Sequence, residues 1–309
     1  MIERLNGNFL QWLRGFYYIV RLGGVSKAAA HMGLKQSTVS HQLKNLEKTL
    51  NVSLFVRHHK ELEITSAGEA LYVKAISLFE HVQTVMDSIG RKEGELKGMI
   101  RLATTHAIAM FFLTKTFQEF HARHPGVRFA VSGGGFGQIT EAVTEGAADF
   151  GIVSLGEFAD HMVYKPLFGS RLVLISPKGN PFGLPEHPTL EDITRVPFIS
   201  FPPRGTVDTT IKALLQSRHL EMQAVITTNT FSLLLNYVRA GLGVTMLDIF
   251  TVHDDEQLYD IYEIADELPD RQYVMIRRKN KQFGDQVEAF MNLIFTSPAP
   301  KGCTSLSIY

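Results

Sequence analysis

The sequence predicts an α/β protein with two parts, a small N-terminal winged helix-turn-helix and a larger α/β region, joined by one long helix. Three observations lead to this prediction. Positive charge is concentrated in the first 60 residues. Short helical segments separated by glycine precede two short strand-like segments in the same stretch. From residue 99 onward, strand-like and helix-like segments alternate, which is the pattern of α/β folds.

The distribution of charge separates the two parts. The chain of 309 residues has 31 Lys and Arg and 31 Asp and Glu, so its formal net charge is zero. Residues 1–60 contain nine Lys or Arg and two Glu, a net charge of +7, which leaves −7 on the other 249 residues. A basic N-terminal part on an acidic remainder predicts that only the N-terminal part binds a polyanion such as nucleic acid.

The composition argues against several classes of protein. Cys303 is the single cysteine, and it cannot form an internal disulfide or a cysteine zinc site. The histidines show no ligand spacing and no Ser/His/Asp pattern occurs, so we expect no metal, no other cofactor and no catalytic residues. The chain has neither a run of about 18 apolar residues nor a signal-peptide pattern, which predicts a cytoplasmic protein with no membrane partner.

Three short helices are expected before residue 51. The first covers residues 9–22 and ends at Gly23-Gly24. The second begins with Ser26 as its N-cap and ends at Gly33, and the third covers residues 35–50 with an apolar stripe along one face. Two helices joined by a tight glycine turn, the second with a polar start, are typical of the helix-turn-helix.

Polar side chains crowd the start of the third helix. Short polar groups at this position reach base edges and phosphates in the major groove, whereas Ser and Thr are poor choices inside a helix. We predict that Gln36 and Ser40 are among the residues that read bases and that Thr38 and Lys44 contact phosphate. The alternative is helix capping and an ordinary solvated face. The predicted DNA contacts of these helices are Ser26, Lys27, Gln36, Ser37, Thr38, Ser40, His41 and Lys44.

Two short strands, at residues 54–56 and 62–64, are predicted after the third helix. The turn between them is basic and contains Arg57, His58 and Lys60. We predict a β-wing whose tip contacts the minor groove or the phosphate backbone, with Arg57 on phosphate. The alternative is a solvated turn without a ligand.

A long helix follows the wing. A capping box from Ser66 to Glu69 starts it, and it is expected to run to about Lys92. Its apolar residues fall at spacings of 4, 3, 4, 3 and 4, which is a heptad seam and predicts a dimerisation helix. The seam consists of Leu71, Ala75, Leu78, Val82, Val85 and Ile89. The predicted domains are therefore residues 1–65 for DNA binding, 66–93 for the linker helix and 94–309 for the α/β region.

The α/β region is long enough for two small subdomains. Strands are expected at residues 100–104, 128–132, 149–153, 171–176, 224–227 and 243–247, with helices between them. This alternation predicts mostly parallel sheets. The last residues, 297–309, are rich in Ser, Pro and Gly, and we expect them to be loose.

Four stretches carry a resemblance to a known family. They are residues 16–34 (Phe-Tyr-Tyr-Ile-Val-Arg-Leu-Gly-Gly-Val-Ser-Lys-Ala-Ala-Ala-His-Met-Gly-Leu), residues 36–47 (Gln-Ser-Thr-Val-Ser-His-Gln-Leu-Lys-Asn-Leu-Glu), Leu54-Phe-Val-Arg57 and Thr65-x-Ala-Gly-Glu69. In residue type and spacing they resemble the LysR-type transcriptional regulators, and the resemblance extends over nearly the whole chain.

This resemblance implies a sequence-specific transcriptional regulator that binds double-stranded promoter DNA. It implies a two-lobed domain like a periplasmic binding protein, in which a small molecule, the effector, binds between the lobes. We assign lobe I to residues 94–166 and 270–296 and lobe II to residues 167–269. The resemblance also implies a homodimer or a homotetramer, and it leaves RNA polymerase open as a partner.

The predicted effector site begins where a strand ends and a helix opens. There, backbone N–H groups and hydroxyls converge, which favours an anion such as a carboxylate. Arg204, ahead of a helix in the other lobe, can pair with a carboxylate or an oxyanion. The alternative for Thr105 is simple N-capping. The predicted effector residues are Thr104, Thr105, His106, Phe136, Gln138, Arg204 and Thr206.

Two short patterns are similar to the sulfate-sensing regulators of cysteine biosynthesis, namely Ala103-Thr-Thr-His106 and Gly146-x-x-Asp149. The apolar run at residues 107–112 and the turn Gly134-Gly-Phe-Gly-Gln138 depart from those regulators, so the effector stays open. Two alternatives to the main prediction remain. One is a binding protein or enzyme with an incidental basic N-terminus, and the other is a regulator without a small effector.

Overall fold

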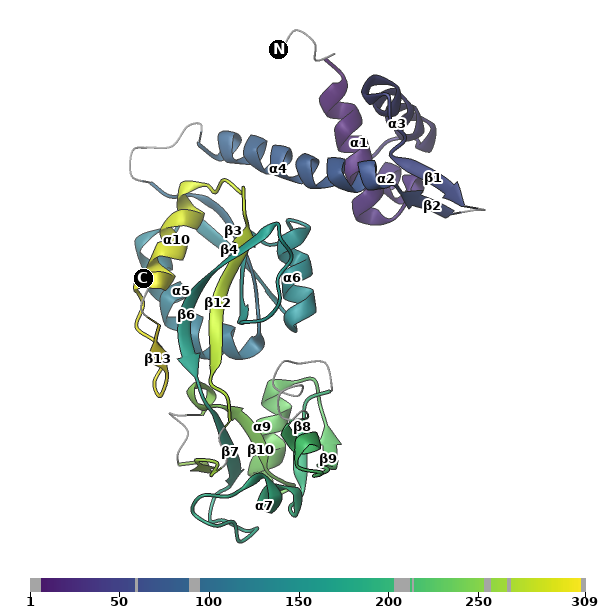
Figure 1. Cartoon of the computed structure of the whole chain (residues 1–309). Coiled ribbons are helices and arrows are strands. Elements are labelled where there is room, and N and C mark those ends of the chain that lie inside the picture. The colour runs from purple at the N-terminus through teal and green to yellow at the C-terminus, as the bar shows by residue number, and fades with distance from the viewer. Residues whose placement is uncertain are drawn as a thin grey trace. The chain divides into compact units, whose positions relative to one another are not determined.

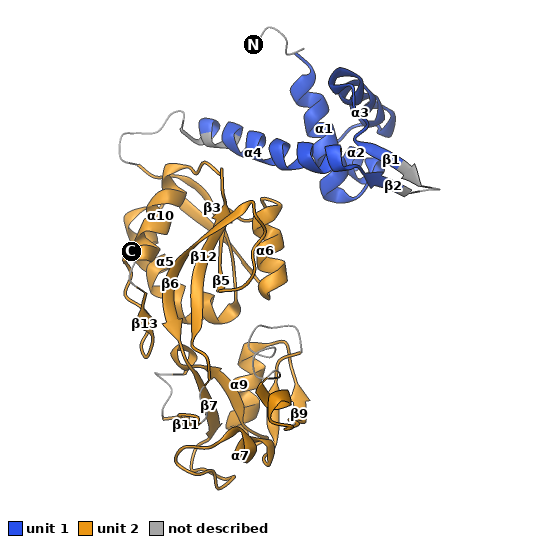
Figure 2. Ribbon diagram, viewed as in Figure 1, with its two compact units in different colours: residues 1–89 blue, residues 90–309 orange. Residues whose placement is uncertain are grey.

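The computed structural model describes residues 7–58, 61–88, 95–202, 212, 214–252, 257–265 and 268–306. The chain divides into two compact units, residues 1–89 and residues 90–309 (Figure 2). The long helix that follows the wing belongs to the first unit.

The first unit consists of three short helices, a hairpin and a long helix (Figure 1). These are α1 (Phe9–Leu22), α2 (Val25–Met32), α3 (Gln36–Leu50), β1 (Phe55–His58), β2 (Glu61–Ile64) and α4 (Ser66–Ser88). Helical spacing of apolar residues brings the inward stripes of α1 and α3 together, with Phe16, Val39 and Leu46 fully buried. Leu54, just ahead of β1, closes this core.

The ends of α1, α2 and α3 agree with the sequence prediction, whereas the caps of α2 and α4 differ from it. The predicted end of the linker helix, about Lys92, lies outside the described residues. Gly23 and Gly33 adopt left-handed φ values of 69° and 66° and end α1 and α2. The cap of α2 is Gly24, so the prediction of Ser26 as N-cap was wrong. Thr65 rather than Ser66 caps α4, because its Oγ1 accepts a hydrogen bond from the Gly68 amide at 3.0 Å.

Lobe I is a six-stranded sheet covered by helices on both faces (Figure 1). One face packs against η2 (Ile108–Phe112), a π-helical turn, and against α5 (Leu113–Arg123) and α10 (Asp285–Thr296). The other face packs against α6 (Phe136–Thr144). The strand order is β13 (Thr304–Ser305), β6 (Met162–Ser170), β12 (Arg271–Arg278), β5 (Phe150–Ser154), β3 (Gly98–Thr104) and β4 (Val127–Gly133).

Lobe II contains two smaller sheets. One has the order β10 (Thr245–Asp248), β7 (Leu172–Pro177), β11 (Tyr259–Tyr262), and the other pairs β8 (Phe198–Ser200) with β9 (Ala224–Thr227). A bridge from Phe198 to Val244 connects them. Its helices include α7 (Leu190–Thr194) and α9 (Phe231–Arg239), residues 214–217 are helical as well, and the turn η3 (Ile249–Thr251) follows β10.

The prediction of mostly parallel sheets was wrong, because the sheets are mixed. Strand β3 pairs in parallel with β4 and β5, and β8 pairs in parallel with β9. Strand β12, however, pairs antiparallel with β5 and β6, and β7 pairs antiparallel with β10 and β11. The long strands β6 and β12 were absent from the sequence prediction. They carry the chain between the lobes instead of forming βαβ units. The chain leaves the sheet of lobe I at Ser170 and enters that of lobe II at Leu172.

The C-terminal segment is ordered where it is described, contrary to the expectation of a loose tail. Thr304 and Ser305 pair with Gly169 and Phe168 and add β13 to the edge of the lobe I sheet. Cys303 is half-buried and packs against the cores of both lobes. The content of proline and glycine indicated a flexible tail. The tail instead forms a short strand because the edge of β6 is available for pairing.

Candidate functional site

The N-terminal half of α3 presents the polar face that the sequence predicted. Val39, Leu43 and Leu46 are buried on one side of the helix. On the opposite side Ser40 is half-buried, and the remaining side chains are exposed to solvent. These exposed residues are Gln36, Ser37, Thr38, His41 and Lys44. Ser26 and Lys27 of α2 are exposed as well.

The start of α3 is also suited to an anion. Lys35 is its N-cap, and no side chain caps the helix there. Free N–H groups at the positive end of a helix attract phosphate. The acidic Glu47 is directed elsewhere, since its Oε1 accepts hydrogen bonds from the amides of Leu54 at 2.8 Å and Phe55 at 3.3 Å. Glu47 therefore holds the wing to α3 and does not oppose a phosphate.

The wing has the predicted hairpin form. Strands β1 and β2 are antiparallel, with Arg57 opposite Leu62 and His58 opposite Glu61. Arg57 and His58 lie at the end of β1 nearest the turn, and Lys60 lies outside the described residues.

In lobe I the three predicted strand-end residues have different environments. Thr104 is fully buried, and its hydroxyl donates to the carbonyl of Ile152 at 2.8 Å, which places it in the sheet core. Thr105 is half-buried, and its Oγ1 accepts a hydrogen bond from the Ile108 amide at 3.3 Å, which is a helix-capping contact. The exposed ring of His106 covers Gly133, where a Cβ would lie 2.7 Å from Nε2.

The second predicted part of lobe I is the start of α6, which follows β4. Gln138 Oε1 accepts a hydrogen bond from the Gly135 amide at 3.1 Å, so this side chain caps its own helix. The ring of Phe136 stacks on that of Phe158, with the ring centroids 5.5 Å apart. Strands β3 and β4 are adjacent and parallel, so the helices that follow them begin at the same edge of the sheet.

Lobe II has a matching strand end that the sequence prediction missed. Arg204 and Thr206 lie outside the described residues. The described polar groups are Ser200 at the end of β8 and Thr227 at the end of β9, whose hydroxyls lie 3.4 Å apart. Thr228 and Thr230 follow, just ahead of α9. Thr228 Oγ1 accepts a hydrogen bond from the Thr230 amide at 3.2 Å. The sequence did contain a signal for this site, because Thr227, Thr228 and Thr230 cluster at the end of a predicted strand, as Thr104 and Thr105 do in lobe I.

Aromatic rings connect the two lobes close to these strand ends. The π-helical turn η2 carries Phe111, whose ring lies 5.5 Å from that of Phe231 at the start of α9. Phe231 also stacks on Phe201, with 6.4 Å between the ring centroids. The turn that follows Thr105 in lobe I and the helix that follows Thr230 in lobe II are therefore in contact.

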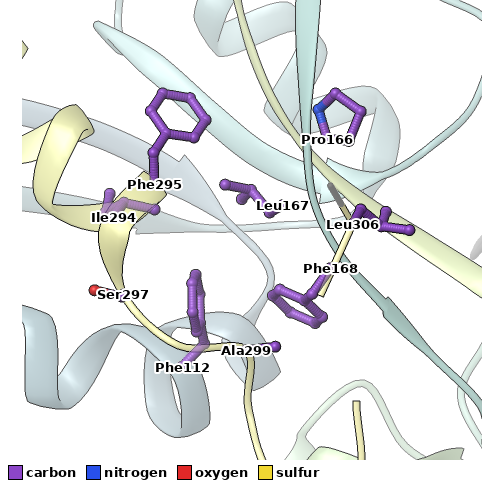
Figure 3. A pocket seen from close by; sticks show the side chains of 9 residues that line it. All are labelled: Phe112, Pro166, Leu167, Phe168, Ile294, Phe295, Ser297, Ala299 and Leu306. Atoms are coloured by element: carbon purple, nitrogen blue, oxygen red, sulfur yellow. The ribbon is translucent and has the colours of Figure 1, made fainter. Parts of the chain in front are cut away.

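Two cavities lie elsewhere in the second unit. One is a small cavity of about 30 Å³ between β6, α10 and the C-terminal segment, lined mostly by apolar residues such as Phe112, Phe168, Phe295 and Leu306 (Figure 3). It has room for little more than a water molecule. The other is an open groove of about 640 Å³ along β7 and β11. Neither is lined by a predicted effector residue.

The groove of lobe II is lined by paired charges. Lys178 Nζ lies 3.0 Å from Asp260 Oδ1, and Arg171 lies 2.7 Å from Glu263. Burial on its own would raise the pKa of Asp260, but hydrogen bonds from Lys178 and from the amides of Asn180 and Gly179 outweigh it and lower that pKa.

The described residues include no group of three or more His, Cys, Asp or Glu placed to bind a metal ion. No described helix is both long enough and apolar enough to cross a membrane.

Comparisons with known proteins match both units. A family model described as the LysR substrate binding domain matches residues 93–297, which is more than half of the chain. A second, described as the bacterial regulatory helix-turn-helix protein of the lysR family, matches residues 10–69.

Individual relatives are distant but match more than nine-tenths of the chain. The regulator YfeR of Shigella flexneri, an uncharacterised HTH-type transcriptional regulator, is 22% identical over 92% of this chain and 92% of its own length. YofA of Bacillus velezensis, also an HTH-type transcriptional regulator, is 25% identical over 92% of this chain and 93% of its own. Among solved structures, a full-length OxyR variant from Pseudomonas aeruginosa superimposes with a TM-score of 0.72 at 16% identity and covers 97% of this chain and 98% of its own.

Proposed function

The chain belongs to the family of LysR-type bacterial transcriptional regulators, and from that premise we propose how its own residues bind DNA and an effector. It is a DNA-binding regulator with an effector-binding domain rather than an enzyme with an incidental basic N-terminus. In our proposal α3 enters the major groove of promoter DNA, with Gln36 and Ser40 reading bases and Thr38 and Lys44 on phosphate.

The observation that supports this proposal is the two-sided character of α3. Val39, Leu43 and Leu46 on its apolar side pack in the core of the first unit, so its polar side is available to a ligand without loss of packing. The ligand-facing side combines small polar groups, an uncapped helix start and Lys44. The wing sequence adds the basic residues Arg57 and His58, which we assign to the phosphate backbone or the minor groove of the flanking DNA.

The test is to select DNA sequences from a random duplex library with the full chain and to measure affinity for the selected duplex across a salt series. Lys44→Ala should weaken binding to all sequences alike and reduce the slope of log affinity against log salt by about 0.9, one phosphate contact. Lys74→Ala, an exposed lysine of α4, is the matched control and should leave the slope unchanged.

Base reading is tested separately with Gln36→Ala and Ser40→Ala. A lost base contact should cost roughly 1–3 kcal/mol and relax the preferred sequence at one or two positions. If both variants select the same sequence with the same preference as the parent chain, the assignment of α3 as the base-reading element is wrong.

For the second unit we propose an anionic effector, such as a carboxylate or an oxyanion, bound between the strand ends of the two lobes. Thr105, His106, Phe136 and Gln138 would contribute from lobe I, and Arg204 and Thr206 from lobe II. Thr104 is left out because its hydroxyl is committed inside the sheet. The proposal is supported by parallel strands that end side by side in lobe I, and by the Thr-rich strand end ahead of α9 in lobe II.

We further propose that the effector alters the closure of the lobes, which re-spaces the DNA-binding domains of a dimer or tetramer and changes DNA bending. The exposed part of α4 supports a self-association role, since Leu78, Val82 and Val85 are 37%, 40% and 46% exposed. If no ligand that binds the chain changes its DNA footprint, this mechanism is ruled out.

The effector test is a thermal-melt screen of the full chain against sulfate, thiosulfate, small carboxylates and amino-acid derivatives. A ligand at a hundred times its dissociation constant should add about 2.7 kcal/mol to the free energy of unfolding. Thr105→Ala lowers the starting stability by removing a cap, so the ligand-induced increment is the quantity compared. Thr114→Ala, an exposed threonine of α5, is the control.

The outcomes separate the chemistries. Stabilisation by sulfate or thiosulfate that disappears in Thr105→Ala would support the similarity to sulfate-sensing regulators. Stabilisation by organic acids alone would assign a carboxylate effector. An increment that survives unchanged in Thr105→Ala would place the ligand elsewhere and contradict the proposed site.

A further inference from the structure

The short turn η3 divides two adjacent residues between the cores of the two lobes. Ile249 is buried in the core of lobe II, together with Val173 and Ile175. The next residue, Phe250, is buried in the core of lobe I. Its ring lies 5.7 Å from that of Phe168 and 5.6 Å from that of Tyr273. The end of β10 is therefore anchored in lobe I although β10 belongs to a lobe II sheet.

Buried polar contacts tie the same corner to the lobe I sheet. Arg271 Nη1 donates to Asp248 Oδ2 at 2.9 Å, and the Tyr273 hydroxyl donates to the same oxygen at 2.8 Å. The side chains of Arg271 and Asp248 are 13% and 8% exposed, and Tyr273 is 3% exposed. Asp248 ends β10 of lobe II, whereas Arg271 and Tyr273 lie on β12 of lobe I, so one carboxylate oxygen joins the two lobes.

This contact lies where the chain crosses between the lobes. Arg271 pairs with Ser170, the last residue of β6, and Asp248 pairs with Leu172, the first residue of β7. The Ile249 amide donates to the carbonyl of Arg171 at 3.0 Å. Because the two crossing strands and η3 meet there, a small displacement at this point rotates one whole lobe against the other.

We propose that Asp248, Arg271 and Tyr273 form a buried latch that sets the angle between lobe I and lobe II. None of the three belongs to the predicted effector residues, so the inference does not depend on which ligand binds. It assigns a conformational role to a charged cluster inside an otherwise apolar junction.

The incomplete hydrogen bonding of the cluster favours this role over simple stabilisation. Asp248 Oδ1 is buried and has no hydrogen-bond partner among the residues that the structure describes. Apolar residues of the same size are often as stabilising as a buried ion pair, and in some proteins the buried polar groups instead fix one particular geometry. Loss of one hydrogen bond to a charged acceptor shifts such an equilibrium by roughly tenfold to a hundredfold.

The test measures the distance between the lobes directly. Nitroxide labels at Glu145→Cys in lobe I and Glu186→Cys in lobe II, both exposed positions, report that distance by pulsed electron paramagnetic resonance. The background is the full chain with Cys303→Ser, assembled with an excess of unlabelled chain so that only distances within one copy are seen. Tyr273→Phe removes one donor of the latch with the smallest change of shape.

Tyr259→Phe is the matched control, because Tyr259 is equally buried and its hydroxyl donates to the Leu235 carbonyl at 3.2 Å within lobe II. We expect Tyr273→Phe to broaden or shift the distance distribution and Tyr259→Phe to leave it as in the background chain. The triple variant Asp248→Leu, Arg271→Met, Tyr273→Phe should melt close to the background chain and still give the broad distribution.

Two results would overturn the latch. One is a distribution in Tyr273→Phe that coincides with that of the background chain. The other is a folded triple variant with a narrow, unshifted distribution, which would show that the apolar junction alone holds the lobes. If the triple variant does not fold, the comparison of Tyr273→Phe with Tyr259→Phe decides the question.

Discussion

The close approach of the wing to the linker helix leaves no room for a methyl group at Gly68. An ideal Cβ on Gly68 would lie 2.4 Å from the Leu54 carbonyl oxygen and 2.6 Å from Ile64 Cγ1. Leu54 is fully buried, and its carbonyl also accepts the Thr65 amide at 3.0 Å, so the backbone there is held in place. Relief of both overlaps requires α4 to move away from the wing.

The expected cost of Gly68→Ala follows from two opposing effects. Alanine is favoured over glycine inside a helix by about 1 kcal/mol, which would stabilise α4. Overpacking of a tight contact costs about 1–3 kcal/mol. Ala70→Gly, at an exposed position of the same helix, calibrates the first effect and should destabilise by about 1 kcal/mol.

The assay is urea unfolding of the full chain followed by the fluorescence of Trp12, the single tryptophan, which packs against the core of the first unit. The loss in the free energy of unfolding of Ala70→Gly measures what alanine gains over glycine in this helix. Gly68→Ala should fail to reach that gain by about 1–3 kcal/mol, the overpacking cost, so that its free energy of unfolding is unchanged or lower than that of the parent chain. A gain in Gly68→Ala equal to the loss in Ala70→Gly would refute the reasoning, because it would show that the methyl group fits.

Three further outcomes are expected. Val82→Lys, on the exposed part of α4, should shift the chain toward smaller assemblies in sedimentation experiments, and an unchanged assembly would exclude this face from the interface. Burial raises the pKa of the Cys303 thiol to about 11, so the folded chain should react with a thiol reagent at pH 8 about a hundredfold more slowly than the urea-unfolded chain. Burial, and next the Asp248 carboxylate, also raise the pKa of Tyr273. The folded phenol therefore stays protonated while the unfolded one ionises near pH 10, and the free energy of unfolding should fall as pH rises through that value, less steeply in Tyr273→Phe.

Local patterns were sufficient to place the helices of residues 9–50, although not the N-cap of α2. The helices of residues 9–50 are specified by apolar spacing, by glycine at their ends and by the polar start of α3, all of which act within a few residues. The same reasoning erred by one residue at the cap of α4. Thr65 and Ser66 are chemically alike, and only the position of Ser53, whose carbonyl accepts the Thr65 hydroxyl at 2.8 Å, distinguishes them.

Long-range pairing decided the features that the sequence prediction missed. Strands β6 and β12 pair although about 110 residues of sequence separate them. Local sequence patterns do not predict which strands will be neighbours in a sheet. The tail forms β13 because the edge of β6 is available to it. Thr104 and Thr105 are the same residue type, yet Thr104 is the last residue of β3, which is buried on both faces at this end, whereas Thr105 follows the strand and lies at the helix start.

The sequence by itself determined the family, the basic helix-turn-helix and the division into a DNA-binding and an effector-binding part, because these depend on residue types at short spacing. Only the tertiary structure decided how the lobes are joined. Asp248 and Arg271 are 23 residues apart and unremarkable in the sequence. Their ion pair exists because the end of β10 and the start of β12, strands of different sheets, meet at the same buried junction. One oxygen of the Asp248 carboxylate therefore bonds to residues of the lobe I sheet.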